Sequence, residues 1–77
     1  MADGHAAVRS EVPGNVWKIL KGEGDRVEAG EPVLIVESMK MEVTVCSPSK
    51  GTVDSLRAKP GQTLSMGQVA AIIRIDA

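Results

Sequence analysis

Short apolar runs, separated by glycine and polar residues, recur along the whole chain and predict strands rather than helices. Turn signals return every 6 to 12 residues, and no stretch shows the period of a helix. The strands that this pattern predicts are residues 7–11, 14–20, 33–37, 42–46, 51–57 and 69–75, with short apolar steps at Val27 and Leu64. Within residues 14–20 the apolar side chains do not alternate strictly, which indicates a β-bulge or a strand covered on both faces.

An internal repeat divides the chain into two similar halves. When the sequence is shifted by 37 positions it aligns with itself without a gap. Three glycine pairs coincide at this shift, in a chain of only eight glycines: Gly14 with Gly51, Gly24 with Gly61, and Gly30 with Gly67. Two copies are too few for a solenoid. The repeat therefore predicts a closed sandwich whose halves are related by a pseudo-two-fold axis.

The composition sets the size and the material of the core. The 77 residues are enough for one small domain, and 43% of them are apolar. Phe and Tyr are absent and Trp17 is the only aromatic residue, so the core must be aliphatic, and the abundant Val and Ile favour strands. We expect an all-β domain over residues 7–77, preceded by a flexible N-terminal tail of residues 1–6.

Charge and cysteine content exclude several classes of function. The formal net charge is −1, basic and acidic residues are interspersed, and aromatic residues that stack on bases are missing, so no nucleic-acid partner is expected. The apolar runs are too short to cross a bilayer and no apolar signal segment begins the chain, so no membrane partner is expected. His5 and Cys46 are single, which leaves no intramolecular disulfide and no metal site built from His and Cys. These features fit a cytoplasmic protein, or an organellar one if the chain is cut from a longer protein.

The centre of the chain contains a bend whose residues are unusual for a turn. Two β-rich runs, residues 33–37 and 42–46, flank the segment 38–41 as in a tight hairpin. That segment reads Ser-Met-Lys-Met and has none of the Gly, Asn or Asp residues that such turns usually contain. Because sequences depart from local rules most often where function requires it, this bend is the first candidate for a functional site.

Lys40 is the residue of the bend that carries reactive chemistry. A lysine amine is a nucleophile towards an activated acyl group once it is deprotonated. An unperturbed lysine has a pKa of about 10.4, so a modifying enzyme would have to supply a base or desolvate the amine. An acylated lysine on a rigid hairpin is a long, uncharged and flexible tether. The competing interpretation is a solubilising charge, with Met39 or Met41 turned inward as core.

The segment Glu37-Ser38-Met39-Lys40-Met41-Glu42 resembles the biotin-attachment motif of biotin-dependent carboxylases, in which a lysine stands between two methionines. The resemblance extends over residues 8–75 and includes the Gly-Asp turn at Gly24. It is strongest to small single-domain biotin/lipoyl attachment proteins and to the carrier domain of urea carboxylase, which share the opening strand at residues 14–18. Position 38 is Ser where Ala is commoner, and the gapless repeat leaves no room for the protruding loop of some bacterial carriers.

This resemblance implies a fold and a function. The family fold is a flattened β-barrel of two four-stranded antiparallel sheets, with the lysine hairpin at the end opposite the termini. Biotin–protein ligase would attach biotin to Lys40, with Met39 and Met41 as flanking recognition residues. A biotin carboxylase would load CO2 onto the biotin, and a carboxyltransferase would pass it to an acceptor. The domain itself would be a carrier rather than an enzyme.

Other residues of the chain suggest further hypotheses. Glu37, Ser38 and Glu42 could orient a partner enzyme, or the two carboxylates could be ordinary exposed strand-end charges. Trp17 could anchor a partner or cover the edge of the sandwich. We expect Cys46 to be half-buried packing on its strand.

Two alternative functions remain open on the sequence. Lipoyl domains share this architecture and also use a hairpin lysine, typically between Asp and Ala, so the attached cofactor could be lipoate. Met39 and Met41 favour biotin over lipoate. The chain could also be a small β interaction module in which Lys40 stays unmodified.

Overall fold

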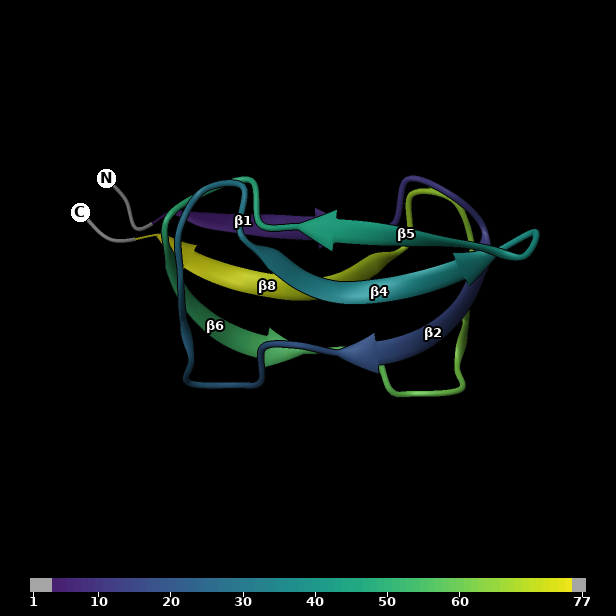
Figure 1. Ribbon diagram of the computed structural model, residues 1–77. Helices are drawn as coiled ribbons and strands as arrows, with labels where there is room; N and C mark the ends of the chain where they lie inside the picture. Colours follow the sequence, from purple (N-terminus) through teal and green to yellow (C-terminus); the bar gives the residue numbers. More distant parts are fainter. Residues whose placement is uncertain (1–3, 76–77) are drawn as a thin grey trace.

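The computed structural model describes residues 4–75, and these form eight strands in two four-stranded antiparallel sheets. One sheet has the strand order β1-β8-β6-β3 and the other has the order β5-β4-β2-β7. The strands are β1 (His5–Arg9), β2 (Gly14–Ile19), β3 (Arg26–Val27), β4 (Pro32–Ser38), β5 (Met41–Cys46), β6 (Gly51–Leu56), β7 (Thr63–Leu64) and β8 (Val69–Ile75). The predicted all-β sandwich is confirmed (Figure 1).

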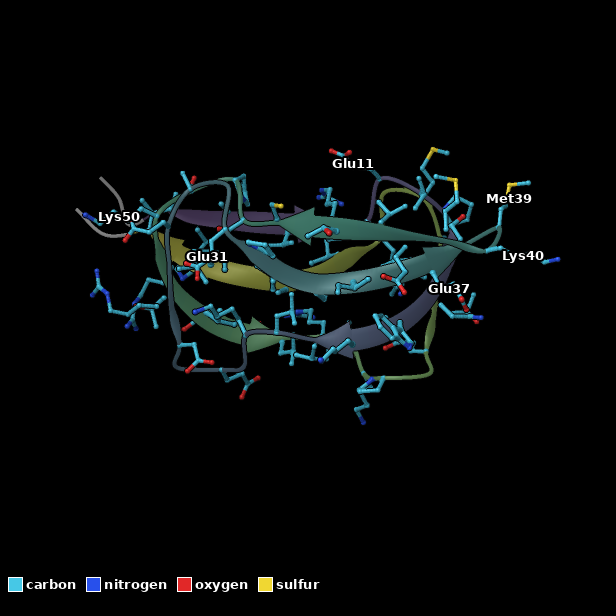
Figure 2. All side chains as sticks on the ribbon, in the orientation of Figure 1. Glu11, Glu31, Glu37, Met39, Lys40 and Lys50 are labelled. Atoms are coloured by element: carbon cyan, nitrogen blue, oxygen red, sulfur yellow. The ribbon has the colours of Figure 1, made fainter. Side chains whose placement is uncertain are left out.

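The sandwich is elongated, and the chain ends and the β4–β5 turn lie at its two opposite ends (Figure 1). The Cα atoms extend over 40 × 19 × 18 Å. Lys50 lies at the end that holds the termini, whereas Lys40 lies at the other end and points away from the body (Figure 2). The hairpin therefore lies at the end of the sandwich away from the chain termini.

The first strand begins earlier than the sequence indicated. β1 starts at His5 instead of residue 7 and ends at Arg9 instead of residue 11. His5 and Ala6 pair with β8, so the prediction of a flexible tail is wrong for these two residues, and residues 1–3 lie outside the described part. The strand ends early because Ser10 is buried and its hydroxyl donates to the carbonyl oxygen of Val12, which bends the chain.

The predicted pseudo-two-fold repeat is present in the strand pairing. β2, β3 and β4 recur 37 positions later as β6, β7 and β8, and β5 corresponds to β1. The predicted irregularity in β2 is a bulge between Val16 and Lys18 in its pairing with β4. The same bulge occurs between Val53 and Ser55, where β6 pairs with β8. Sequence repeat and structural repeat therefore agree at the level of single residues.

The core between the sheets is aliphatic, as the composition predicted. Its largest members, among them Leu34, Leu64 and Ile73, are fully buried. The remaining core residues are Val8, Val16, Val27, Val33, Val36, Val45, Val53, Ala58, Ala70 and Ala71. Small side chains suit the places where backbones approach closely: a Cβ on Gly51 would lie only 2.1 Å from the carbonyl oxygen of Arg74.

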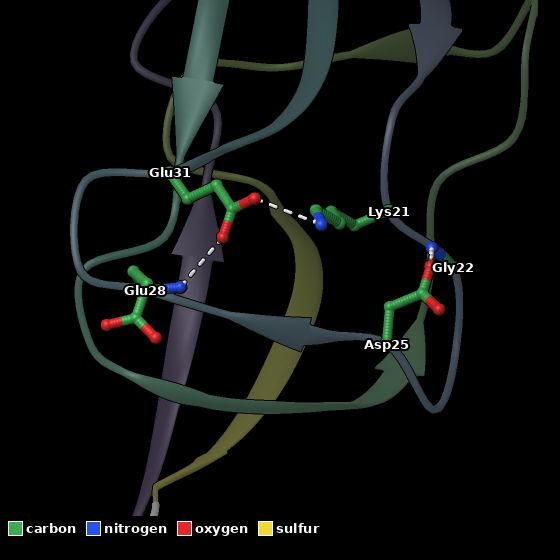
Figure 3. A network of polar contacts seen from close by, with 5 residues as sticks. All are labelled: Lys21, Gly22, Asp25, Glu28 and Glu31. Carbon is green, nitrogen blue, oxygen red and sulfur yellow. Dashed lines mark hydrogen bonds and ion pairs between the residues drawn. The ribbon is translucent and has the colours of Figure 1, made fainter.

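The turn before β4 is held by a carboxylate where the related turn has an amide. The Glu31 carboxylate accepts a hydrogen bond from the backbone N–H of Glu28 at 2.9 Å, and it forms an ion pair with the Lys21 amine at 3.0 Å (Figure 3). At the related position Gln68 accepts from the backbone N–H of Ser65 at 2.8 Å. The Glu28 N–H, and then Lys21, lower the pKa of Glu31 below its ordinary value of 4.5.

Glu31→Gln should make the stability of the fold less dependent on pH. The amide can keep the backbone hydrogen bond, as Gln68 does, but it loses the charge. Because the folded-state pKa of Glu31 is depressed, its contribution is full above the ordinary pKa of 4.5 and is lost as the pH falls through the lower folded value. Urea unfolding should therefore show E31Q less stable than the parent chain at pH 7, with a smaller deficit at pH 3.

The matched control for this experiment is Glu11→Gln. Glu11 is exposed and makes no hydrogen bond or ion pair among residues 4–75, so its substitution removes one carboxylate without removing a contact. A deficit of E31Q that is the same at both pH values would contradict the role assigned to the ionised Glu31.

Candidate functional site

The predicted bend is a hairpin with a two-residue turn. β4 and β5 pair up to Ser38 and Met41, which leaves Met39 and Lys40 as the turn itself. Both turn residues have positive φ, 51° for Met39 and 67° for Lys40. Positive φ at both central positions is the signature of the type I′ turn, whose twist matches that of two paired strands. The hairpin is therefore regular, but it is built from residues that disfavour its backbone conformation.

The side chains around Lys40 point into solvent. Met39 is 94% exposed and Met41 is 66% exposed, so the interpretation that one of them is core is wrong. Lys40 is exposed as well, and no hydrogen bond or ion pair among residues 4–75 involves its amine. Met39 and Lys40 project from the tip of the hairpin (Figure 2). A partner can thus reach the amine from several directions, and the tip presents two thioethers beside it.

The base of the hairpin is fixed in the sandwich. β4 is an inner strand of its sheet, and its residues Val33, Leu34 and Val36 are fully buried. The opening of β2 passes close to the hairpin, since a Cβ on Gly14 would lie 2.4 Å from the carbonyl oxygen of Glu37. Gly14 is therefore a positioning residue for the hairpin. Its match with Gly51 in the repeat is the signal that marks both as close backbone approaches.

Two carboxylates lie directly opposite each other below the tip. Glu37 pairs with Glu42 across β4 and β5, and both side chains are exposed. Like charges at directly opposed positions of a sheet destabilise it slightly. On the other side of β4, Asn15 of β2 pairs with Glu37, and the Asn15 Oδ1 accepts a hydrogen bond from the hydroxyl of Thr63 at 2.8 Å. Ser38 is half-buried at the last pair of the ladder.

The remaining candidate residues lie away from the hairpin tip. Cys46 is exposed at the far end of β5, so the prediction that it is half-buried is wrong. Trp17 is 52% exposed at the β2 bulge and does not close the core. His5 lies 3.8 Å from the Asp54 carboxylate at the opposite end of the sandwich.

The two cavities found along the sandwich lie away from the hairpin tip. Two cavities of about 190 and 500 Å³ lie along the edge strands β1 and β5, and both are lined by Arg9, Glu11 and Cys46. None of residues 37–42 lines either cavity. Within the described part of the chain, no group of three His, Cys, Asp or Glu side chains could hold a metal ion, and no helix is long and apolar enough to cross a membrane.

Comparisons with known proteins agree with this geometry. A family model described as "Biotin-requiring enzyme" matches residues 6–73. The Biotin/lipoyl attachment protein of Bacillus subtilis (strain 168) is 37% identical over 62 residues, which cover 80% of this chain and 85% of that protein. The chain belongs to the biotin/lipoyl attachment family. Its fold and its exposed hairpin lysine are those that the family resemblance implied.

Larger relatives contain this domain as a small part. Urea amidolyase of Saccharomyces cerevisiae is 34% identical over 71 residues, which cover 92% of this chain and 4% of that protein. The crystal structure of Kluyveromyces lactis urea carboxylase superposes with a TM-score of 0.87 at 36% identity, over 95% of this chain and 6% of that one. The biotin/lipoyl domain thus occurs both in a protein of about its own size and inside proteins many times longer.

Met39→Asn should stabilise this biotin/lipoyl domain. Asn tolerates positive φ better than Met, and a side chain that is 94% exposed gives up no core packing when it is replaced. Relief of left-handed strain of about 1 kcal/mol should raise the free energy of unfolding by a similar amount. For a domain of this size that corresponds to a rise in melting temperature of roughly 4–8 °C.

Met41→Asn is the matched control for the turn. Met41 is also exposed but belongs to β5, where Asn is a poor strand residue, so this change should leave stability unchanged or lower it. A Met39→Asn chain that unfolds at a lower denaturant concentration than the parent would show that the turn is not strained at residue 39.

Proposed function

We propose that this domain is a biotin carboxyl carrier, with biotin attached to the amine of Lys40. The observation that carries the proposal is the isolated, exposed lysine on a two-residue turn between two exposed methionines. The nearest carboxylates, Glu37 and Glu42, lie on the strands and are solvent-exposed, so the tip has no buried base of its own. A modifying enzyme must therefore bring the base and the activated acyl group.

The attachment step is an acyl transfer to the lysine amine. The deprotonated amine of Lys40 attacks the activated carboxyl carbon, a C–N bond forms, the activating group leaves with its electron pair, and the amine nitrogen loses a proton. The amide that results is uncharged. The enzyme that performs it would be a biotin–protein ligase, and Met39 and Met41 would provide apolar contacts beside the amine.

The fold suits a carrier because it separates the reactive tip from the rest of the domain. Biotin, when attached, supplies a ring nitrogen that carries CO2 from a biotin carboxylase to a carboxyltransferase. The chain's own residues supply the rigid base of the arm, through the buried part of β4 and the close contact of Gly14 with Glu37. Glu37, Ser38 and Glu42 lie on β4 and β5 next to the tip and would contact these partner enzymes.

Lipoate is the second candidate for the attached group. The name of the Bacillus subtilis relative covers both biotin and lipoyl attachment, and the same hairpin lysine would serve either cofactor. The exposed methionine pair, which differs from the Asp and Ala that typically flank a lipoyl lysine, supports biotin. The carried group would then be CO2 rather than an acyl group.

Co-expression with a biotin–protein ligase in biotin-supplemented cells should add the mass of one biotinyl group to the chain. Intact-mass measurement of the parent chain, Lys40→Arg and Lys50→Arg provides the test. We expect the gain in the parent and in Lys50→Arg, because Lys50 is an exposed lysine at the opposite end, and no gain in Lys40→Arg. A gain of one lipoyl group under lipoate supplementation would support the second candidate. An unmodified mass under both supplements would leave an unmodified β module and refute the carrier function.

A further inference from the structure

The two thioethers beside Lys40 are unusually open to solution. Methionine is among the residue types most often buried, and its sulfur usually fills gaps in a core. Here 94% of Met39 and 66% of Met41 is accessible, and neither belongs to the core cluster. The one lysine that we propose as the attachment site is therefore placed between two sulfur atoms that any small oxidant in solution can reach.

We propose that Met39 and Met41 form a peroxide-sensitive pair, and that their oxidation to sulfoxides blocks the attachment of a cofactor to Lys40. The inference rests on the proposed carrier function. In the reaction a lone pair of the thioether sulfur attacks one oxygen of hydrogen peroxide or an alkyl hydroperoxide, an S–O bond forms and the O–O bond breaks. The sulfur is oxidised by two electrons, and the second oxygen leaves as water or an alcohol after taking up a proton.

Oxidation changes the surface that a modifying enzyme must cover. A thioether is apolar and flexible, whereas a sulfoxide carries a strong hydrogen-bond acceptor that needs a partner when it is buried. Because Met39 and Met41 flank Lys40, an enzyme that covers the tip during attachment would bury one or both sulfoxide oxygens. An unpartnered buried acceptor costs enough to lower the rate of attachment by about tenfold or more.

The same change should leave the fold intact. Neither sulfur packs against the core, and the backbone of the turn is held by the pairing of Ser38 with Met41 rather than by the methionine side chains. Oxidation is also reversible, because methionine sulfoxide reductases return both sulfoxide epimers to the thioether. The pair would therefore act as a switch on the site and not as damage to the domain.

Two other sulfur atoms of the described chain must be separated from this effect. Cys46 is exposed at the far end of β5 and would react with peroxide as well, so the experiment uses Cys46→Ser chains throughout. Met66 is 70% exposed in the turn between β7 and β8, where it lines a cavity with Cys46 and Pro48 instead of flanking Lys40. Met66 is thus a matched thioether of similar exposure outside the attachment motif.

The test compares initial rates of biotin attachment by a biotin–protein ligase before and after treatment of the apo chain with hydrogen peroxide. Peptide mapping locates each added oxygen, and circular dichroism melting checks the fold. Four chains are used, each with Cys46→Ser: no further change, Met66→Leu, Met39→Leu with Met41→Leu, and all three leucine substitutions. A second aliquot of each oxidised chain is repaired with the two sulfoxide reductases before the assay.

We expect the first two chains to lose about tenfold or more of their rate on oxidation and to recover it on repair. The Met39→Leu/Met41→Leu chains should have the same rate before and after peroxide, whatever that rate is. Equal rates for the oxidised and the repaired parent chain would overturn the inference, and so would a loss that Met66→Leu prevents. Failure of the untreated parent chain to accept biotin would instead refute the proposed function.

Discussion

The two halves of the chain contribute strands to both sheets, and the rest of the structure depends on this interlocked arrangement. The first half comprises β1–β4 and the second comprises β5–β8. In each sheet the two inner strands come from one half, and the two edge strands come from the other. The halves are also joined by a reciprocal pair of backbone hydrogen bonds, from Gly24 N–H to the oxygen of Val53 and from Gly61 N–H to the oxygen of Val16, both 2.8 Å. Neither half can complete a sheet alone, so the aliphatic core forms only when both are present.

The interlocked arrangement explains why Met39 and Lys40 can occupy a turn whose positive φ angles these residue types disfavour. The pseudo-two-fold axis relates the base of the Lys40 hairpin to the ends of the described chain, where Ile75 N–H donates to the oxygen of Gly4 at 2.9 Å. One end of the sandwich is thus closed without any turn, and the other needs only a two-residue link. Because Met39 and Lys40 are exposed and lie outside the core cluster, recognition rather than packing can select them. The left-handed backbone conformation costs about 1–2 kcal/mol at each of these two residues. The pairing of β4 with β5 below the turn maintains it.

The strands and the pseudo-two-fold relation could be predicted from the sequence. The alternation of apolar and polar residues indicates the strands, and the repeat of 37 positions indicates the same strands in both halves. The end of β1 could not be predicted, because the sequence does not distinguish a buried serine that bends the backbone from an exposed one. Cys46 was misplaced because its apolar character was given more weight than the alternation of β5, in which Val45 faces inward and the next residue outward. The turn type was hidden as well, since Met and Lys do not predict positive φ. Only the register of β4 with β5 imposes it.

Moving the lysine by one residue tests most directly whether the turn geometry selects the attachment site. The double variant Met39→Lys, Lys40→Met keeps the composition and exchanges the amine and one thioether between the two exposed positive-φ positions of the turn. The measurement is the initial rate of biotin attachment by a biotin–protein ligase, with peptide mapping of the product. If the second turn position specifies the site, the parent chain is biotinylated at Lys40 and the double variant gains no biotin. Equal rates for the two chains would contradict the account, because any exposed lysine on this hairpin would then suffice.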